Sequence, residues 1–175
     1  AELFSAAYRA LHKVSPTVTV LNGGFSEVKR HPDFIPNFLS LTEEMPDVYA
    51  FHSHGPWTNL RRAALDTQRY LTGAGWEPES IWLNEAGLSS VGHQTDTAQA
   101  AEVVKKVTFA ASQGYQGYIW YNLRNDGTDP NENEHNFGLV KADLRQNPLW
   151  SPPTPSCGSW GASGPWCRCR CLRPA

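Results

Sequence analysis

A glutamate, Glu85, stands directly after the short apolar run of residues 81–84, and two small residues, Ala86 and Gly87, follow it. The run predicts a buried strand, which places Glu85 at the carboxyl end of that strand. A carboxylate in this place can act in catalysis as a nucleophile or as an acid and base, or it can only cap a loop or pair with a cation. The small residues after it leave the carboxylate open to a reactant.

Polar side chains also follow the three other short apolar runs of the chain. These groups are Asn22-Gly23-Gly24, His52-Ser53-His54 and Tyr121-Asn122-Leu123-Arg124. A packed core would not select such residues, and no comparable group precedes the runs. In parallel α/β folds the carboxyl ends of the strands form the working face. Four polar strand ends therefore predict the rim of an active site.

The elements that must position these residues alternate between helix and strand. Periodicity and stop signals predict helices over 1–16, 33–42, 58–75 and 95–114, and strands over 17–25, 47–55, 80–87 and 117–123. The strands begin near Val18, Val48, Ile81 and Tyr118, which are 30, 33 and 37 residues apart. This spacing is typical of βα units, so we expect an α/β fold with four parallel strands and helices outside.

Two of the expected helices show a clear apolar stripe. Helix 1–16 places Leu3, Ala7 and Leu11 together. Helix 95–114 is the clearest and has one face formed by Ala101, Val104, Thr108 and Ala111. For helix 58–75 the sequence favours Thr58 as the N-cap and Gly73 as the residue past the end.

Composition sets outer bounds on the function. The chain has 175 residues and a formal net charge of −2, and no apolar run reaches the roughly 18 residues that a spanning helix needs. Residues 151–175 hold three arginines and no acidic residue, so the first 150 residues carry a net negative charge. We therefore expect neither nucleic acid nor a membrane as a partner.

The segment of residues 1–148 resembles the second half of a clan A (β/α)8 glycoside hydrolase. In that clan an acid/base glutamate follows strand four and a nucleophile glutamate follows strand seven. The matching stretches run in order: ELFSAAYRALHKVSPTVTVLNGGFS as helix four and strand five, VYAFHSHG as strand six, SIWLNEAG as strand seven, and GYIWYNLRNDG with EHNFGLV as strand eight and its loop. The resemblance implies a partial TIM barrel.

The resemblance implies a role for each strand-end residue. Glu85 matches the nucleophile, and His52 and His54 match the strand-six position that holds the nucleophile or the sugar, although many relatives carry Tyr where His54 stands. Trp120 matches the aromatic that forms the floor of the sugar subsite. Asn84 is a further donor toward Glu85. Hydroxyl contacts with a carbohydrate substrate are expected from Tyr121, Asn122 and Arg124.

The resemblance also implies parts that this chain does not contain. A complete barrel needs ~250 residues, whereas about 150 fit here, and strand four with its acid/base glutamate would precede residue 1. The chain opens inside a helical pattern without Met, so we expect upstream sequence. We expect residues 1–150 to form the C-terminal half of a barrel that self-associates through its open edges.

The functional alternatives follow from this incomplete barrel. The first is a fragment of a retaining glycosidase that acts on β-linked poly- or oligosaccharides. The second is a non-catalytic carbohydrate-binding or structural remnant of such a barrel. A phosphate-using barrel is a third, which the isolated Gly87 and Gly127 and the acidic last loop disfavour.

Neither the tail nor the acidic loop predicts a metal or another cofactor. Residues 151–175 are rich in Pro, Gly, Cys and Arg, which predicts a disordered or non-native tail. Its cysteines, Cys157, Cys167, Cys169 and Cys171, lack the paired spacing of zinc sites. Residues 126–134 lack the central glycine and the flanking helices of an EF-hand, so we expect a solvated loop above the site.

Overall fold

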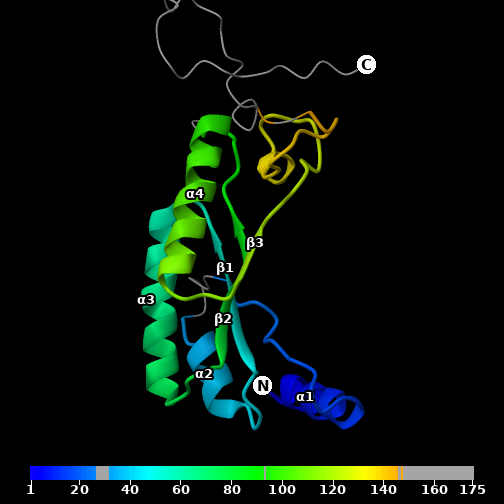
Figure 1. Ribbon diagram of the computed structural model, residues 1–175, viewed down its shortest axis with the longest axis vertical. Helices are drawn as coiled ribbons and strands as arrows, with labels where there is room; N and C mark the ends of the chain where they lie inside the picture. Colours follow the sequence, from blue (N-terminus) through cyan, green and yellow to red (C-terminus); the bar gives the residue numbers. More distant parts are fainter. Residues whose placement is uncertain (27–31, 93, 146, 148–175) are drawn as a thin grey trace, which may run out of the picture.

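Three parallel strands in the order β1-β2-β3 form the sheet of the protein, seen in a computed structural model that describes residues 1–26, 32–92, 94–145 and 147 (Figure 1). The elements in chain order are α1 (Glu2–Val14), α2 (Phe34–Leu41), β1 (Val48–His54), α3 (Trp57–Ala74), β2 (Ser80–Gly87), α4 (Asp96–Ser112), β3 (Gly117–Trp120) and a 3₁₀ helix, η1 (Glu134–Asn136). Helices α3 and α4 lie side by side along one face of the sheet, and α1 lies apart from them near its lower end. The predicted α/β fold with parallel strands is confirmed.

The predicted first strand, residues 17–25, does not form a continuous strand in the structure. Residues 18–25 run beside β1 and make only two isolated parallel bridges, Leu21 to Val48 and Phe25 to Phe51. Between the bridges the side chain of Asn22 takes over the pairing, because its Nδ2 donates to Ala50 O at 2.6 Å and its Oδ1 accepts from Ala50 N at 2.7 Å. Asn22 is buried, so it is a structural residue rather than part of a functional rim.

The core lies between the sheet and the two long helices. Tyr49 and Phe51 of β1 and Leu83 of β2 point to this side, where they pack against Leu60 and Leu71 of α3. Each of these side chains is at most 7% exposed, so the layer is fully desolvated. Burial of such side chains contributes roughly 1.5–3 kcal/mol each before the entropy cost of folding. This layer fixes the orientation of β1 and β2.

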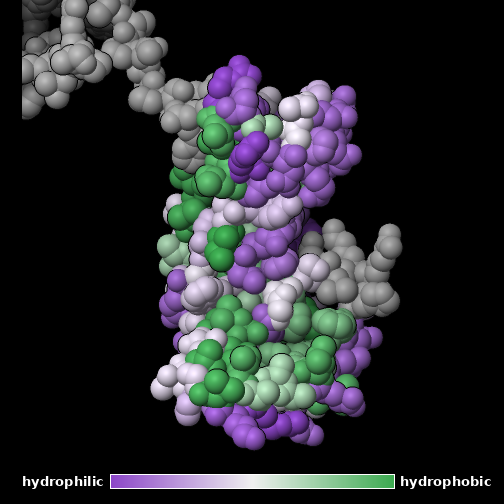
Figure 2. All heavy atoms as spheres, turned by 90° about the vertical axis from the view of Figure 1, so that its right-hand side faces the viewer, coloured by the Kyte–Doolittle hydropathy of each residue, from purple (hydrophilic) through white to green (hydrophobic). Residues whose placement is uncertain are grey.

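The apolar stripes of α1 and α4 face solvent. Val104 is 62% exposed and Leu3 is 85% exposed. The buried positions of α4 are instead Gln99, Glu102, Lys106 and Ala110. Figure 2 shows the hydrophobic surface over α1 at the lower end of the molecule.

The ends of α3 differ from the prediction. The helix begins at Trp57 after Pro56, and the backbone N–H of Trp57 donates to the carboxylate of Glu102 on α4. The helix ends at Gly75 with φ 62°, a left-handed conformation that glycine adopts without strain. Thr58 is therefore not the N-cap and Gly73 lies inside the helix.

The membrane and the tail were the two remaining subjects of the sequence predictions. No helix in the described ranges is long and apolar enough to cross a membrane. The tail of residues 151–175 lies outside the described residues.

Candidate active site

The carboxylate of Glu85 lies between the two histidines of β1. Its Oε1 is 2.8 Å from Nε2 of His54, and its Oε2 is 3.7 Å from Nδ1 of His52. The three side chains are partly exposed, at 32% for Glu85, 36% for His54 and 22% for His52. The group is thus shielded from bulk water but accessible to a ligand at the carboxyl ends of the strands.

The register of the sheet brings these residues together. His52 is paired with Glu85 and His54 with Gly87, so two residues of one face of β1 flank the glutamate. The register shifts by one residue between Phe51 and His52, opposite the extra residue Asn84. Such a bulge redirects the side chains that follow it, and here it turns Glu85 toward the histidines and away from the core.

The pKa of His52 is shifted by its surroundings. Burial lowers the pKa of His52 below its ordinary value of 6.5, Glu85 opposes this effect, and the charge of His54 adds to it. His52 is therefore neutral at pH 7. A neutral His52 can still donate one hydrogen bond to Glu85 or to a ligand.

Two glycines create the space around this group. A Cβ on Gly24 would lie 2.2 Å from Nε2 of His52. A Cβ on Gly87 would lie 2.6 Å from Tyr121 O, 2.9 Å from the Phe137 ring and 3.0 Å from Nδ1 of His54. Any side chain on Gly87 would therefore displace the walls of the site.

Aromatic rings form one wall of the site beside His54. The centroid of the His54 ring is 5.7 Å from that of Tyr121 and 5.4 Å from that of Phe137, both in edge-to-face geometry. The Tyr121 hydroxyl donates to Glu134 at 3.4 Å. Burial and the nearby Glu134 and Asp126 raise the pKa of this hydroxyl, so Tyr121 is a neutral donor at physiological pH.

Asn84 also approaches this region, and Asn122 follows Tyr121 in the chain. The Asn84 amide lies near His52, because a Cβ on Gly24 would be 2.9 Å from its Nδ2. The Oδ1 atoms of Asn84 and Asn122 are buried, and neither has a hydrogen-bond partner within the described residues. A buried oxygen without a partner is unusual in a folded protein, and both atoms retain the capacity to accept a hydrogen bond.

Trp120 and Arg124 do not join the group around Glu85. The Trp120 ring lies on the α4 side of β3, where its Nε1 donates to Phe137 O at 3.1 Å and the Lys106 amine is 5.9 Å from the ring centroid. Side chains alternate along a strand, so the next residue, Tyr121, occupies the site face instead. Arg124 bonds the backbone of its own loop, with Nε donating to Ala142 O at 2.9 Å.

Phe137 was not predicted as a site residue. This residue is 6% exposed and belongs to the loop after η1, far from any strand end in the chain. Its position on His54 depends on how the loop of residues 121–140 folds back, and no local pattern encodes that path. Within the described ranges, no three His, Cys, Asp or Glu residues are grouped so that they could hold a metal ion.

Comparisons with solved structures identify the architecture. A family 39 glycoside hydrolase from the gut symbiont Bacteroides cellulosilyticus WH2 is 26% identical, with a TM-score of 0.64 over 85% of this chain and 35% of that one. A family 39 β-xylosidase from Caulobacter crescentus is 16% identical, with a TM-score of 0.58 over 85% and 34%. A Bifidobacterium dentium β-glucuronidase, complexed with coumarin-3-O-glucuronide, is 14% identical, with a TM-score of 0.53 over 83% and 25%.

These similarities confirm that the chain resembles part of a (β/α)8 glycoside hydrolase and has the fold of a partial TIM barrel. The chain spans about a third of the length of the two family 39 structures. No model of a known protein family matches the sequence. A search of curated proteins finds no match either.

Proposed function

We propose that this chain is part of a retaining glycoside hydrolase that acts on β-linked poly- or oligosaccharides, with Glu85 as its nucleophile. The observation that carries the proposal is the pair of contacts from His54 and His52 to Glu85 at the carboxyl ends of the strands. A hydrogen bond from His54 orients the carboxylate, and this orientation is needed for attack on an anomeric carbon. The similarity to glycoside hydrolases supports this assignment.

A retaining mechanism needs a second carboxyl group about 5–5.5 Å from the first. That group protonates the departing oxygen and later activates water. We propose that it comes from a part of the barrel that this sequence does not include, because the chain spans about a third of its structural neighbours. The chain alone should therefore not cleave natural oligosaccharides at a useful rate.

The walls of the site suit a sugar. Tyr121 lies beside His54, where its ring offers apolar contact and its hydroxyl a polar one, and the Asn84 amide lies near His52. Asn122, the residue after Tyr121, is included on the resemblance alone. We propose that these residues, with His52, bind substrate hydroxyls. We leave Trp120 and Arg124 out of this set, because their side chains donate to Phe137 O and Ala142 O.

The test uses aryl β-glycosides, whose leaving groups depart without a proton. The purified chain should release aryl alcohol slowly, and Glu85→Ala should abolish the release. A 2-deoxy-2-fluoro glycoside with an activated aryl leaving group should label the wild type. Fluorine slows both formation and hydrolysis of the glycosyl ester, and the activated leaving group restores only its formation, so the ester accumulates. Mass spectrometry should place the label on the peptide that contains Glu85.

Label on another residue would refute the nucleophile assignment. Brisk turnover of natural oligosaccharides would show that the chain contains its own acid, with Glu132 and Glu134 the first residues to test. A chain that binds oligosaccharides without release or label would be the non-catalytic remnant.

A further inference from the structure

We propose that Gln99, a buried residue of α4, is a positioning residue for the candidate active site. Its amide fixes the backbone at Asn136 and Phe137, which sets the Phe137 ring against His54 and so holds His54 on Glu85. The catalytic meaning of this role rests on the proposed function of Glu85, but the structural coupling can be measured without activity.

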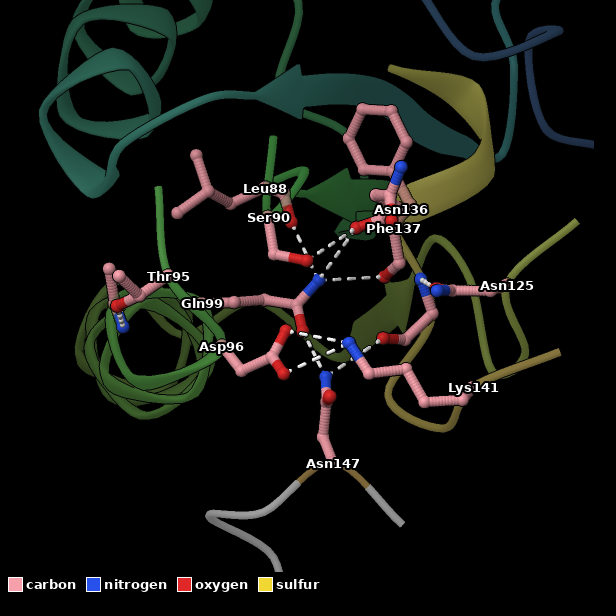
Figure 3. Close-up of polar contacts among 12 residues, drawn as sticks. Leu88, Ser90, Thr95, Asp96, Gln99, Asn125, Asn136, Phe137, Lys141 and Asn147 are labelled. Carbon is pink, nitrogen blue, oxygen red and sulfur yellow. Dashed lines mark hydrogen bonds and ion pairs between the residues drawn. The ribbon is translucent and has the colours of Figure 1, made fainter. Parts of the chain in front are cut away.

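The Gln99 side chain is bonded at both ends (Figure 3). Its Nε2 donates to the carbonyl oxygens of Leu88 at 2.9 Å, Asn136 at 3.2 Å and Phe137 at 3.2 Å, and its Oε1 accepts from Nδ2 of Asn147 at 3.0 Å. The residue is 0% exposed. A buried amide stabilises a fold only when it is bonded in this way, so the position is specific for the contacts of glutamine.

These bonds join three segments that are distant in the chain. Leu88 follows β2, Asn136 and Phe137 belong to the loop after β3, and Asn147 lies near the end of the described residues. In Figure 3 the Gln99 amide lies at the centre, between α4 and this loop. Phe137 is bonded to this amide through its carbonyl oxygen and contacts His54 through its ring, so the amide sets where that ring lies.

The Phe137 ring passes the constraint to the site. It is packed against His54 and Tyr121, with both centroid distances at 5.4 Å. It also lies so close to Gly87 that a Cβ there would be 2.9 Å from the ring. A shift of the Phe137 backbone must therefore move the ring or open a cavity beside His54.

His54 depends on this packing more than most histidines at an active site would. A second hydrogen bond at the other ring nitrogen normally fixes the orientation of a histidine. Here Nδ1 of His54 is buried and has no hydrogen-bond partner within the described residues. The ring is held by Glu85 on one side and by Phe137 and Tyr121 on the others.

The experiment follows the ring nitrogens of His54 by NMR in the full chain, with His52→Gln used for assignment. Gln99→Met keeps the length of the side chain and removes its polar atoms, whereas Gln99→Glu keeps the shape and turns an acceptor toward three carbonyls. Lys141→Met is the matched control. It removes another contact between α4 and the same loop, the Lys141 to Asp96 ion pair at 2.9 Å, and leaves Asn136 and Phe137 bonded.

We expect the wild type and Lys141→Met to show one His54 state with a protected Nε2 proton, and both Gln99 variants to lose that protection. Of the hydrogen bonds to Gln99, Asn147→Ala removes only the one to Oε1, so it should show a smaller loss of protection. This variant tests the proposal if the Gln99 variants do not fold. Unchanged His54 signals in a folded Gln99 variant, or in Asn147→Ala when those variants are unfolded, would overturn the proposal.

Aryl glycoside release separates this outcome from failure of the proposed function. If Glu85 is not a nucleophile, aryl glycoside release does not depend on Glu85 and cannot report on Gln99. The NMR signals of His54 still respond to the Gln99 variants in that case. If both hold, the Gln99 variants should lower kcat more than they raise KM, because Tyr121 and His52 stay in place while His54, the partner of Glu85, is misplaced.

Discussion

Nε2 of His54 lies 2.8 Å from Oε1 of Glu85, although the two residues are not opposite each other in the sheet. The bond runs diagonally across the strands, from a residue whose backbone partner is Gly87. The absence of a side chain on Gly87 clears the path for this diagonal. The geometry of the site thus depends on one bulge and one glycine as much as on the two reacting groups.

Removing the diagonal bond should impair attack by Glu85. A hydrogen bond to a charged group contributes about 1.5–3 kcal/mol, so His54→Ala should slow aryl glycoside release by roughly 10- to 100-fold. His135→Ala, in the loop, serves as a control that should leave the rate unchanged. An equal rate for His54→Ala and wild type in steady-state assays would show that the contact has no role in the reaction.

The shifted pKa of His52 makes stability depend on acidity. Because the pKa is lower in the folded chain than its ordinary value of 6.5, the unfolded chain binds a proton that the folded chain does not bind. The contribution is therefore present above pH 6.5 and is lost as the pH falls toward the folded pKa. Urea unfolding between about pH 7 and pH 5 should show a smaller loss in His52→Gln than in wild type.

The opposite end of the pH scale tests Lys106. This residue is 0% exposed, its amine donates to Ser53 O and Gly87 O, and burial lowers its pKa to about 8. Between about pH 8 and pH 10 the unfolded chain holds a proton that the folded chain has released, so stability should rise with pH. Lys106→Met should remove this rise, while Lys105→Met should keep it. If the free energy of unfolding changes with pH equally in wild type and Lys106→Met, the lowered pKa of Lys106 would be contradicted.

Two glycine substitutions distinguish a site glycine from a helix glycine. Gly87→Ala should destabilise the chain by about 1–3 kcal/mol through overpacking, and it should disturb the His54 signals because the new methyl meets Nδ1 of His54 at 3.0 Å. Gly73→Ala, inside α3 with open space around it, should stabilise by about 0.5–1 kcal/mol. Thermal unfolding of the two variants should therefore shift in opposite directions.

The sequence predicted the order of the elements well because βα units carry strong periodic signals. It placed Glu85 and the two histidines correctly at strand ends, since strand ends are marked by a change from apolar to polar residues. It failed at the first strand, where Asn22 bonds to β1 through its side chain, a contact that looks like a loop signal in the sequence.

Orientation was harder to predict than position. A bulge changes which residues share a face, so neither Trp120 nor Tyr121 could be assigned to the site from alternation alone. The buried face of α4 was missed for a related reason. Its polar residues Gln99, Glu102 and Lys106 are satisfied by distant backbone groups, which no periodic pattern reveals.

The two edges of the sheet are unlike in the described residues, and we expect this difference to decide how copies of the chain pair with each other. On the β1 side the Asn22 amide and two isolated bridges interrupt the backbone ladder, so that side is a poor template for another strand. On the other side β3 is a continuous strand, with Ile119 50% exposed. If copies pair through β3 alone, the β3 strands of two chains pair with each other in a two-fold dimer. Such a dimer has no further β3 edge to offer, so it cannot extend into a filament. Sedimentation should accordingly show dimers that do not enlarge with concentration, and Ile119→Lys should convert them to monomers.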